Sequence, residues 1–396
     1  MDVYSKEEFN KNFNISYVDD SLPKPGLALA IRHCVCSIFL YFGIYLLLMN
    51  NPFFGPRFRD EMQACFQLFI LLYVLTAPFI YIVFRPKSLY TSHSINIFNY
   101  LKRIVKSIFC KNSLLKMNFK DFFETLTPSY HEKQAIMLYF IKVFFGTLMV
   151  ESFLININYF SVNSGNIKSI FDGLFLSYNS FKLTMYARGG ELYQYFISLL
   201  YTLDVMVFIV GYLSELACLH NKIRSVETSA PGIIFCLACY PPFNETTGSF
   251  VGWSQENLTA TPDGAIGVFI WVLRIIGALF LCIYVMASFA LGTKASNLTN
   301  RGTVSRFPYN IVRHPAYISK NTFWLCTTIP VIIINLGNYH TLFDAAKYVT
   351  FVLLSFIIWA GIYYIRAITE ERHLMKDPEY RAYTEKVKYR FIPGVF

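Results

Sequence analysis

The stretch AIGVFIWVLRIIGALFLCIYVMASFAL, residues 265–291, decides the fold class. It carries a single charged side chain, Arg274, in 27 residues. A helix needs about 20 mainly apolar residues to cross a bilayer, because the hydrocarbon core is about 30 Å thick and a helix rises 1.5 Å per residue. The stretch is therefore predicted to be a transmembrane helix.

Other apolar stretches of the chain are long enough to form further membrane helices. They are residues 27–49, 62–84, 135–153, 195–218, 322–334 and 348–365, the last two forming a predicted helical hairpin around residues 336–344. The piece 232–240 is too short to span, runs into Pro241 and Pro242, and is predicted to be re-entrant or an interfacial turn. We expect about 7–8 transmembrane or re-entrant helices.

The composition agrees with that pattern. The 396 residues are 55% hydrophobic, 18% aromatic and only 15% charged, which does not suit a water-soluble globule. Residues 1–26 contain several Asp and Glu and lack the basic start of a secretory signal, so this segment is expected to be retained. The sequence predicts an all-α polytopic membrane protein.

A basic segment between the second and third predicted spans sets the orientation. Residues 85–120 hold eight Lys or Arg and neither Asp nor Glu, which predicts a cytoplasmic loop. Within it, residues 97–109 place apolar side chains near one helical face and basic side chains largely elsewhere, as in a helix lying on an anionic leaflet. The net charge of +10 raises the question of nucleic acid, but the basic residues flank apolar spans and no nucleic acid partner is expected.

Cysteines and ionisable residues inside the spans are the next candidates for function. Cys236 and Cys239 form a CxxC with no second pair, so two small buried thiols are favoured over a metal or redox site, and no metal is expected. The ionisable residues are predicted to pair between helices or to line a polar cavity for a substrate headgroup, and Asp204 and Glu215 to share one helix about three turns apart. They are Arg32, His33, Lys142, Glu151, Asp204, Glu215 and Arg274.

These observations divide the chain into five predicted regions. They are a polar tail (1–26), two transmembrane helices (27–84), a basic cytoplasmic segment (85–134), further helices and polar loops (135–292), and a C-terminal core (293–396).

The C-terminal core begins with FPYNIVRHPAYISK, residues 307–320, and continues through the helical hairpin to TEERHL, residues 369–374, and a tail ending YRFIPGVF. This order resembles the membrane methyltransferases related to isoprenylcysteine carboxyl methyltransferase and the phospholipid N-methyltransferases. The resemblance covers about the last quarter of the chain. The matching positions are Pro308, Tyr309, Arg313, His314, Pro315, Tyr317, Glu370, Glu371, Tyr380, Tyr383, Ile392 and Pro393.

The resemblance implies S-adenosylmethionine as cofactor and a lipid or lipid-modified acceptor. It implies Arg313 and Glu371 as catalytic residues and a cofactor site formed by Tyr309, Arg313, His314, Pro315, Tyr317, Glu370, Glu371, Tyr380 and Tyr383. An isoprenylcysteine carboxylate is the first expected acceptor and an aminophospholipid the second. The chain departs from the pattern at Phe307 and Ser319, where the family usually has the glycine that allows close backbone approach to a ligand.

The chemistry of S-adenosylmethionine agrees with these residue types. Its ammonium and hydroxyl groups need carboxylates, its carboxylate needs donors, and its adenine and sulfonium suit aromatic walls. Arg313 and His314 are donors, and Glu370 and Glu371 point about 100° apart, so one glutamate is free to face the cofactor while the other braces an arginine. Pro315 favours a fixed turn that exposes His314. The tail is expected to fold back as a short helix over the adenosine.

Two other functions remain open. Membrane sterol reductases also resemble this tail and bind NADPH, although TEERHL stands where they carry an Arg-Asp-Glu segment. A transporter or scaffold would use Asp204, Glu215 and Arg274 as its pathway. The topology is also open: the core reaches the cytoplasmic side only if the stretch after about residue 223 crosses the membrane, or if one of the predicted spans at residues 135 and 195 is wrong.

Overall fold

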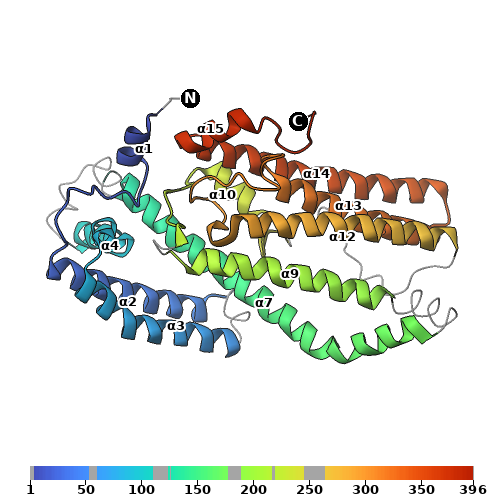
Figure 1. Cartoon of the computed structure of the whole chain (residues 1–396), viewed down its shortest axis with the longest axis horizontal. Helices are drawn as coiled ribbons and strands as arrows, with labels where there is room; N and C mark the ends of the chain where they lie inside the picture. The colour runs from blue at the N-terminus through green and yellow to red at the C-terminus, as the bar shows by residue number, and fades with distance from the viewer. Residues whose placement is uncertain are drawn as a thin grey trace. The chain divides into compact units, whose positions relative to one another are not determined.

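The computed structural model describes residues 4–52, 60–109, 124, 126–176, 189–215, 219–244 and 264–395. The chain is an all-α polytopic membrane protein (Figure 1). Within the described residues, seven helices are long and apolar enough to cross a membrane. Each corresponds to one of the seven apolar stretches identified in the sequence. Cys110, Cys218 and the last three lysines of the predicted basic segment, Lys111, Lys116 and Lys120, lie outside the described residues.

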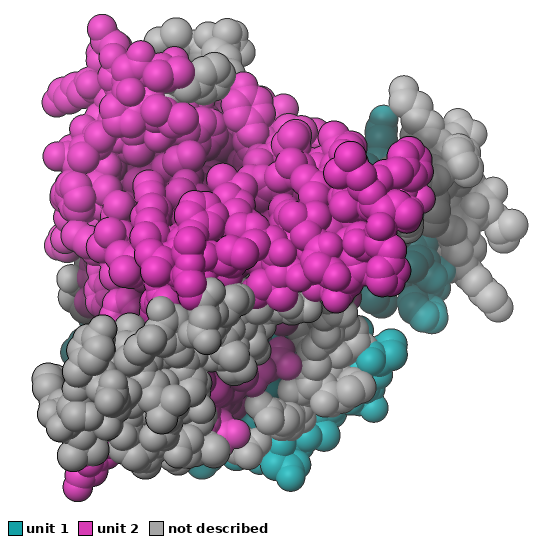
Figure 2. All heavy atoms as spheres, turned by 90° about the vertical axis from the view of Figure 1, so that its right-hand side faces the viewer, with its two compact units in different colours: residues 1–147, 222–228, 298–301 teal, residues 148–221, 229–297, 302–396 magenta. Residues whose placement is uncertain are grey.

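Two compact units make up the chain, coloured separately in Figure 2. Unit 1 comprises residues 1–147, 222–228 and 298–301, and unit 2 comprises residues 148–221, 229–297 and 302–396. Helix α7 (Tyr130–Leu176) runs through both units. It contains a candidate span, Tyr130–Phe160.

Unit 1 contains the N-terminal membrane helices. The short helix α1 (Lys6–Asn12) is followed by α2 (Leu27–Asn50) and by α3 (Asp60–Pro78), which continues as a π-helix (Phe79–Phe84). A 3₁₀ turn (Lys87–Thr91) leads into α4 (His93–Phe109). The two-residue strands β1 (Ser225–Val226) and β2 (Thr299–Asn300) pair antiparallel.

Helix α4 is oriented as an interfacial helix would be. Figure 1 shows α4 end-on, whereas α2 and α3 lie lengthwise across the view. Leu101, Val105 and Phe109 are exposed, as are Lys102 and Lys106 beside them. A helix that crosses the direction of two spanning helices and exposes apolar and basic side chains together is suited to the membrane surface.

Unit 2 consists of α9 (Gly189–Leu213), α10 (Ala230–Leu237), α12 (Ala265–Leu291), α13 (Pro315–Asn335), α14 (Leu342–Leu374) and α15 (Pro378–Lys386). Short 3₁₀ turns follow α12 (Gly292–Lys294) and α13 (Leu336–Asn338). Val268, Ile275 and Leu279 of α12 are each more than half exposed, at 58%, 57% and 60%. Such large apolar side chains on one surface are expected where lipid, and not water, is the solvent.

Contacts between distant residues give the relative directions of the helices in unit 2. Tyr193 near the start of α9 lies 5.5 Å from Arg274 of α12, and the hydroxyl of Tyr212 near its end accepts a hydrogen bond from the backbone N–H of Asn297 at 2.9 Å. Helices α9 and α12 are therefore parallel. Helices α13 and α14 form an antiparallel hairpin, as predicted. Tyr317 near the start of α13 lies beside Tyr363 in the second half of α14, and Asn335 at the end of α13 donates a hydrogen bond to the hydroxyl of Tyr348 in the first half of α14.

This arrangement corrects two expectations about the spans. Helix α9 ends at Leu213, so Glu215 does not share a helix with Asp204. The hairpin helices are longer than their apolar cores, since α13 begins at Pro315 and α14 continues to Leu374, because polar flanks extend both helices beyond the apolar signal. As predicted for the segment around residues 232–240, α10 is too short to span, at about 12 Å for 1.5 Å per residue. Residues 245–263, between α10 and α12, lie outside the described residues.

Candidate functional site

The arginine-histidine turn forms the start of α13. His314 is the N-cap of this helix and Pro315 occupies its first turn, where a missing N–H and a fixed φ are tolerated. The C-terminal tail lies against the turn, because the N–H groups of Arg313 and His314 donate to the carbonyl oxygens of Tyr389 and Arg390, each at 2.9 Å. The tail thereby fixes the turn by backbone hydrogen bonds.

Glu371 is the centre of the ion-pair network. Its Oε1 lies 3.1 Å from Nε2 of His314, and its Oε2 accepts from Nη1 of Arg313 at 3.2 Å and from Nε of Arg390 at 2.9 Å. The carboxylate is buried, at 5% exposure, so its partners replace the water it has lost. The last turn of α14, the first turn of α13 and the tail meet at this one side chain.

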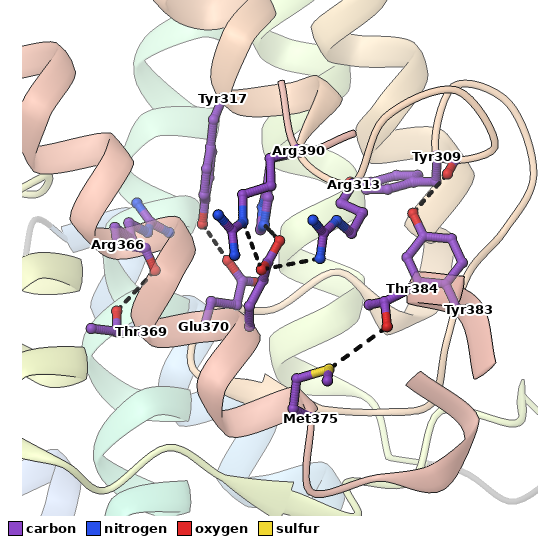
Figure 3. A network of polar contacts seen from close by, with 12 residues as sticks. Tyr309, Arg313, Tyr317, Arg366, Thr369, Glu370, Met375, Tyr383, Thr384 and Arg390 are labelled. Atoms are coloured by element: carbon purple, nitrogen blue, oxygen red, sulfur yellow. Dashed lines mark hydrogen bonds and ion pairs between the residues drawn. The ribbon is translucent and has the colours of Figure 1, made fainter. Parts of the chain in front are cut away.

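Glu370 is placed differently from its neighbour. Its Oε2 accepts a hydrogen bond from the hydroxyl of Tyr317 at 2.6 Å. Its other oxygen has no partner among the described residues. Figure 3 shows Tyr317 directed along its length toward this glutamate. The sequence expectation that one of the two glutamates braces an arginine agrees with this geometry, in which Glu371 contacts Arg313.

Arg313 also has an unused polar atom. Nη1 donates to Glu371 and Nη2 donates to the carbonyl oxygen of Lys388 at 3.0 Å, but the buried Nε has no partner among the described residues. The site therefore offers an open carboxylate oxygen on Glu370 and an orphaned donor on Arg313. These two groups have the polarity that the ammonium and carboxylate of S-adenosylmethionine require, so the residues present fit that cofactor.

Aromatic rings surround the polar groups. The rings of His314 and Tyr317 are stacked, with centroids 5.3 Å apart and planes at 10°, and Phe391 of the tail lies 5.6 Å from His314. His314 is only 7% exposed. The expectation that Pro315 exposes His314 is therefore wrong, because the tail and Glu371 cover the imidazole.

The tail folds as the short helix α15, which was predicted. The hydroxyl of Tyr383 donates to the carbonyl oxygen of Tyr309 at 2.7 Å, and Tyr380 packs beside Tyr383. Burial raises the pKa of Tyr309, Tyr380 and Tyr383 above the usual tyrosine value, so all three hydroxyls stay protonated at neutral pH. The hydrogen bond from Tyr383 links α15 to the segment before the turn.

Sequence reasoning missed two partners. Arg390 stands in a basic tail and reaches Glu371 across 19 positions, and no local pattern connects the two. Asn297 accepts from Nη2 of Arg366 at 2.7 Å and donates to the hydroxyl of Tyr240 at 2.9 Å. The guanidinium of Arg366 also lies 5.1 Å from the ring centroid of Tyr317. A buried arginine one turn before Glu370 was the available signal.

The other predicted polar residues lie elsewhere. Asp204 accepts from the hydroxyls of Tyr284 and Ser288, and Arg274 lies over the rings of Tyr193 and Trp271. In unit 1, His33 pairs with Ser92. Within the described residues there is no group of three or more His, Cys, Asp or Glu that could hold a metal ion.

Comparison with known protein families found no matching family model, and comparison with curated proteins found no match.

Proposed function

We propose that the protein is a membrane methyltransferase that uses S-adenosylmethionine to methylate a lipid or lipid-modified acceptor. The observation that supports this most is the meeting of the Arg313–His314 turn with Glu370 and Glu371, which are more than fifty positions apart in sequence. The resemblance of the C-terminal core to membrane methyltransferases requires this meeting, and a set of unrelated interfacial loops does not.

The two glutamates take different parts in this proposal. Glu371 has both oxygens occupied and holds the turn to the tail, so it positions Arg313. Glu370 and the Nε of Arg313 are the groups with capacity left to bind the cofactor. The aromatic rings of His314, Tyr317 and Phe391 exclude water from the surroundings.

The chemical demand on the protein is mainly alignment. S-adenosylmethionine supplies a methyl group on a sulfonium with a good leaving group, so the protein must bring the acceptor into line and close contact. A carboxylate acceptor needs no base. An amine acceptor must in addition lose a proton to a base.

The helix directions support a cytoplasmic site. Helix α9 runs antiparallel to α7, since Asn156 and Phe160 contact Ser198 and Tyr195 respectively. If each spanning helix crosses the membrane, the amino-terminal end of α7 faces the same side as the start of α13 and the end of α14. That end follows the basic segment which the positive-inside rule assigns to the cytoplasm.

The test is methyl transfer by the purified chain in nanodiscs, with methyl-labelled S-adenosylmethionine and two acceptors. N-acetyl-S-farnesylcysteine tests the carboxylate and phosphatidylethanolamine tests the amine. We expect label in one acceptor, and loss of that label in Glu370→Gln but not in Glu385→Gln, which changes an exposed glutamate of α15. Binding of NADPH without binding of S-adenosylmethionine would favour the reductase alternative.

A further inference from the structure

Lys320 lies one helical turn beyond Tyr317 on α13, inside the core of unit 2. Its Nζ is 5.2 Å from the ring centroids of both Tyr284 and Trp324. Those two side chains are only 8% and 6% exposed and belong to the hydrophobic core formed by α9, α12, α13 and α14. The ammonium therefore lies among buried aromatic rings of this core.

No described residue forms a hydrogen bond or ion pair with this ammonium. The nearby carboxylate of Asp204 is engaged otherwise, because Tyr284 donates to its Oδ2 at 2.7 Å and Ser288 donates to its Oδ1. Asp204 and Lys320 interact only through their charges at longer range. All three N–H donors of Lys320 are thus left for another molecule.

The ring contacts do not balance the cost of this placement. The attraction of a cation to an aromatic ring is weaker than the hydration that a buried ammonium gives up. Lysines inside a membrane are therefore uncommon unless a partner for the ammonium exists. The Lys320 residue as a whole is only partly buried, so its side chain is not sealed inside the core.

A second cation makes an anion the fitting partner. The buried guanidinium of Arg366 is close enough to Lys320 for their charges to interact, and it faces the ring of Tyr317 from α14. Two positive groups in this neighbourhood attract an oxyanion and repel an ammonium. Tyr317 in turn bonds Glu370, so this place adjoins the proposed cofactor site.

We propose that Lys320 binds the oxyanion of the lipid-borne acceptor, a carboxylate or a phosphate. The inference rests on the proposed function for the identity of the acceptor and deepens it, because it names the charge that the acceptor carries. A prenylated cysteine supplies such an oxyanion through its carboxylate and a phospholipid through its phosphate. Lys320 is then a specificity residue that holds the headgroup one turn away from the Arg313 turn.

The experiment measures binding and does not depend on methyl transfer. Calorimetric titration in detergent compares N-acetyl-S-farnesylcysteine with its methyl ester, and dihexanoyl phosphatidylethanolamine with dihexanoylglycerol. The parent chain is expected to prefer one oxyanion over its neutral analogue by about tenfold or more, as hydrogen bonds to a charged group allow. The pair that shows the preference identifies the source of the oxyanion.

Variants assign that preference to Lys320. Lys320→Gln should abolish it, Lys320→Arg should keep most of it, and Lys347→Gln, which changes an exposed lysine of α14, should keep all of it. Equal binding of charged and neutral ligands by the parent chain overturns the inference, as does a preference that survives in Lys320→Gln. The comparison within the parent chain holds even if a variant does not fold.

A third binding measurement separates the acceptor from the cofactor. The affinity for S-adenosylmethionine should be the same in the parent chain and in Lys320→Gln. A loss of that affinity would assign Lys320 to the cofactor carboxylate and overturn the inference. If the parent chain transfers no methyl group to any acceptor, the proposed function fails while the oxyanion preference is still decided by the titrations.

Discussion

Glu371 and Glu370 show how adjacent residues can have different duties. Successive side chains on a helix point about 100° apart, so Glu371 meets the turn and the tail while Glu370 meets Tyr317. The sequence identified both glutamates and predicted that they would divide in this way. It did not identify which of the two glutamates forms the ion pairs with the arginines, because the partner Arg390 belongs to a tail whose path no local pattern specifies.

Replacing Glu371 by Gln is expected to destabilise unit 2. The change leaves Arg313 and Arg390 without their shared carboxylate, and breaking a buried ion pair costs about 3–5 kcal/mol. The measurement is the thermal unfolding midpoint in detergent, with Glu385→Gln as the control on the exposed face of α15. Equal midpoints for the two variants would mean that Glu371 is not a brace.

Tyr383→Phe removes the hydroxyl that donates to the carbonyl of Tyr309. The expected loss is about 1 kcal/mol of unfolding free energy, the net value of a typical hydrogen bond. Because burial raises the pKa of Tyr383, its protonated form is the favoured one in the folded state and the contribution is lost only as pH rises above about 10.

The same variant therefore makes a prediction about pH. The difference in unfolding midpoint between Tyr383→Phe and the parent chain should be equal at about pH 6 and about pH 8. Tyr389→Phe, which alters a more exposed ring of the same tail, serves as the control. A difference that disappears at the higher pH would show that the hydroxyl already ionises there.

At the scale of elements, the apolar stretches predicted the seven membrane helices, but they predicted the positions of the helix ends less well. Thr322 marks where the apolar signal of α13 begins, yet the helix starts at Pro315, because proline suits a first helical turn and the tail holds the residues before it by backbone hydrogen bonds. Glu215 follows apolar sequence but lies beyond the end of α9. Helix ends depend on caps and tertiary contacts, which hydropathy does not record.

The packing of α9 against the turn after α12 depends on one glycine. A Cβ on Gly211 would lie 1.8 Å from the carbonyl oxygen of Ala295, a backbone atom that cannot move without shifting the turn. Gly211→Ala is expected to lower the yield of folded protein severely, because overpacking of a tight contact forces the backbone apart. Fluorescence-detected size exclusion of a tagged chain measures this yield.

Gly361 of α14 provides the matched control. A Cβ there would meet nothing within 4 Å. Gly361→Ala should be neutral or slightly stabilising, since alanine favours a helix by up to about 1 kcal/mol over glycine. Normal folding of both variants would contradict the close approach of α9 and Ala295.

At the scale of the whole molecule, the parallel direction of α9 and α12 decides which ends of unit 2 lie together. Hydropathy could not supply this, since α10 is too short to span and the remaining connection lies at residues 245–263. The direction is carried by contacts between distant residues, such as Tyr212 with Asn297. Counting predicted spans alone placed the Arg313 turn on the wrong side of the membrane for a cytosolic cofactor.

Single-cysteine labelling tests this topology. In sealed vesicles, an impermeant maleimide should label Ser305→Cys and Ser88→Cys from the same side, and His340→Cys in the loop of the hairpin from the other. The parent chain provides the background, because its own cysteines include the exposed Cys65. Labelling of Ser305→Cys and His340→Cys from one side would contradict the assignment of α13 as a spanning helix.

Equilibrium binding of labelled S-adenosylmethionine tests the central claim most directly. The parent chain in nanodiscs is expected to bind the cofactor and not NADPH. Glu370→Gln should weaken that binding by about tenfold or more, because a charge-assisted hydrogen bond is lost, while Glu385→Gln leaves it unchanged. A folded parent chain that binds no S-adenosylmethionine, or a Glu370→Gln variant that binds it as well as the parent does, would contradict the account.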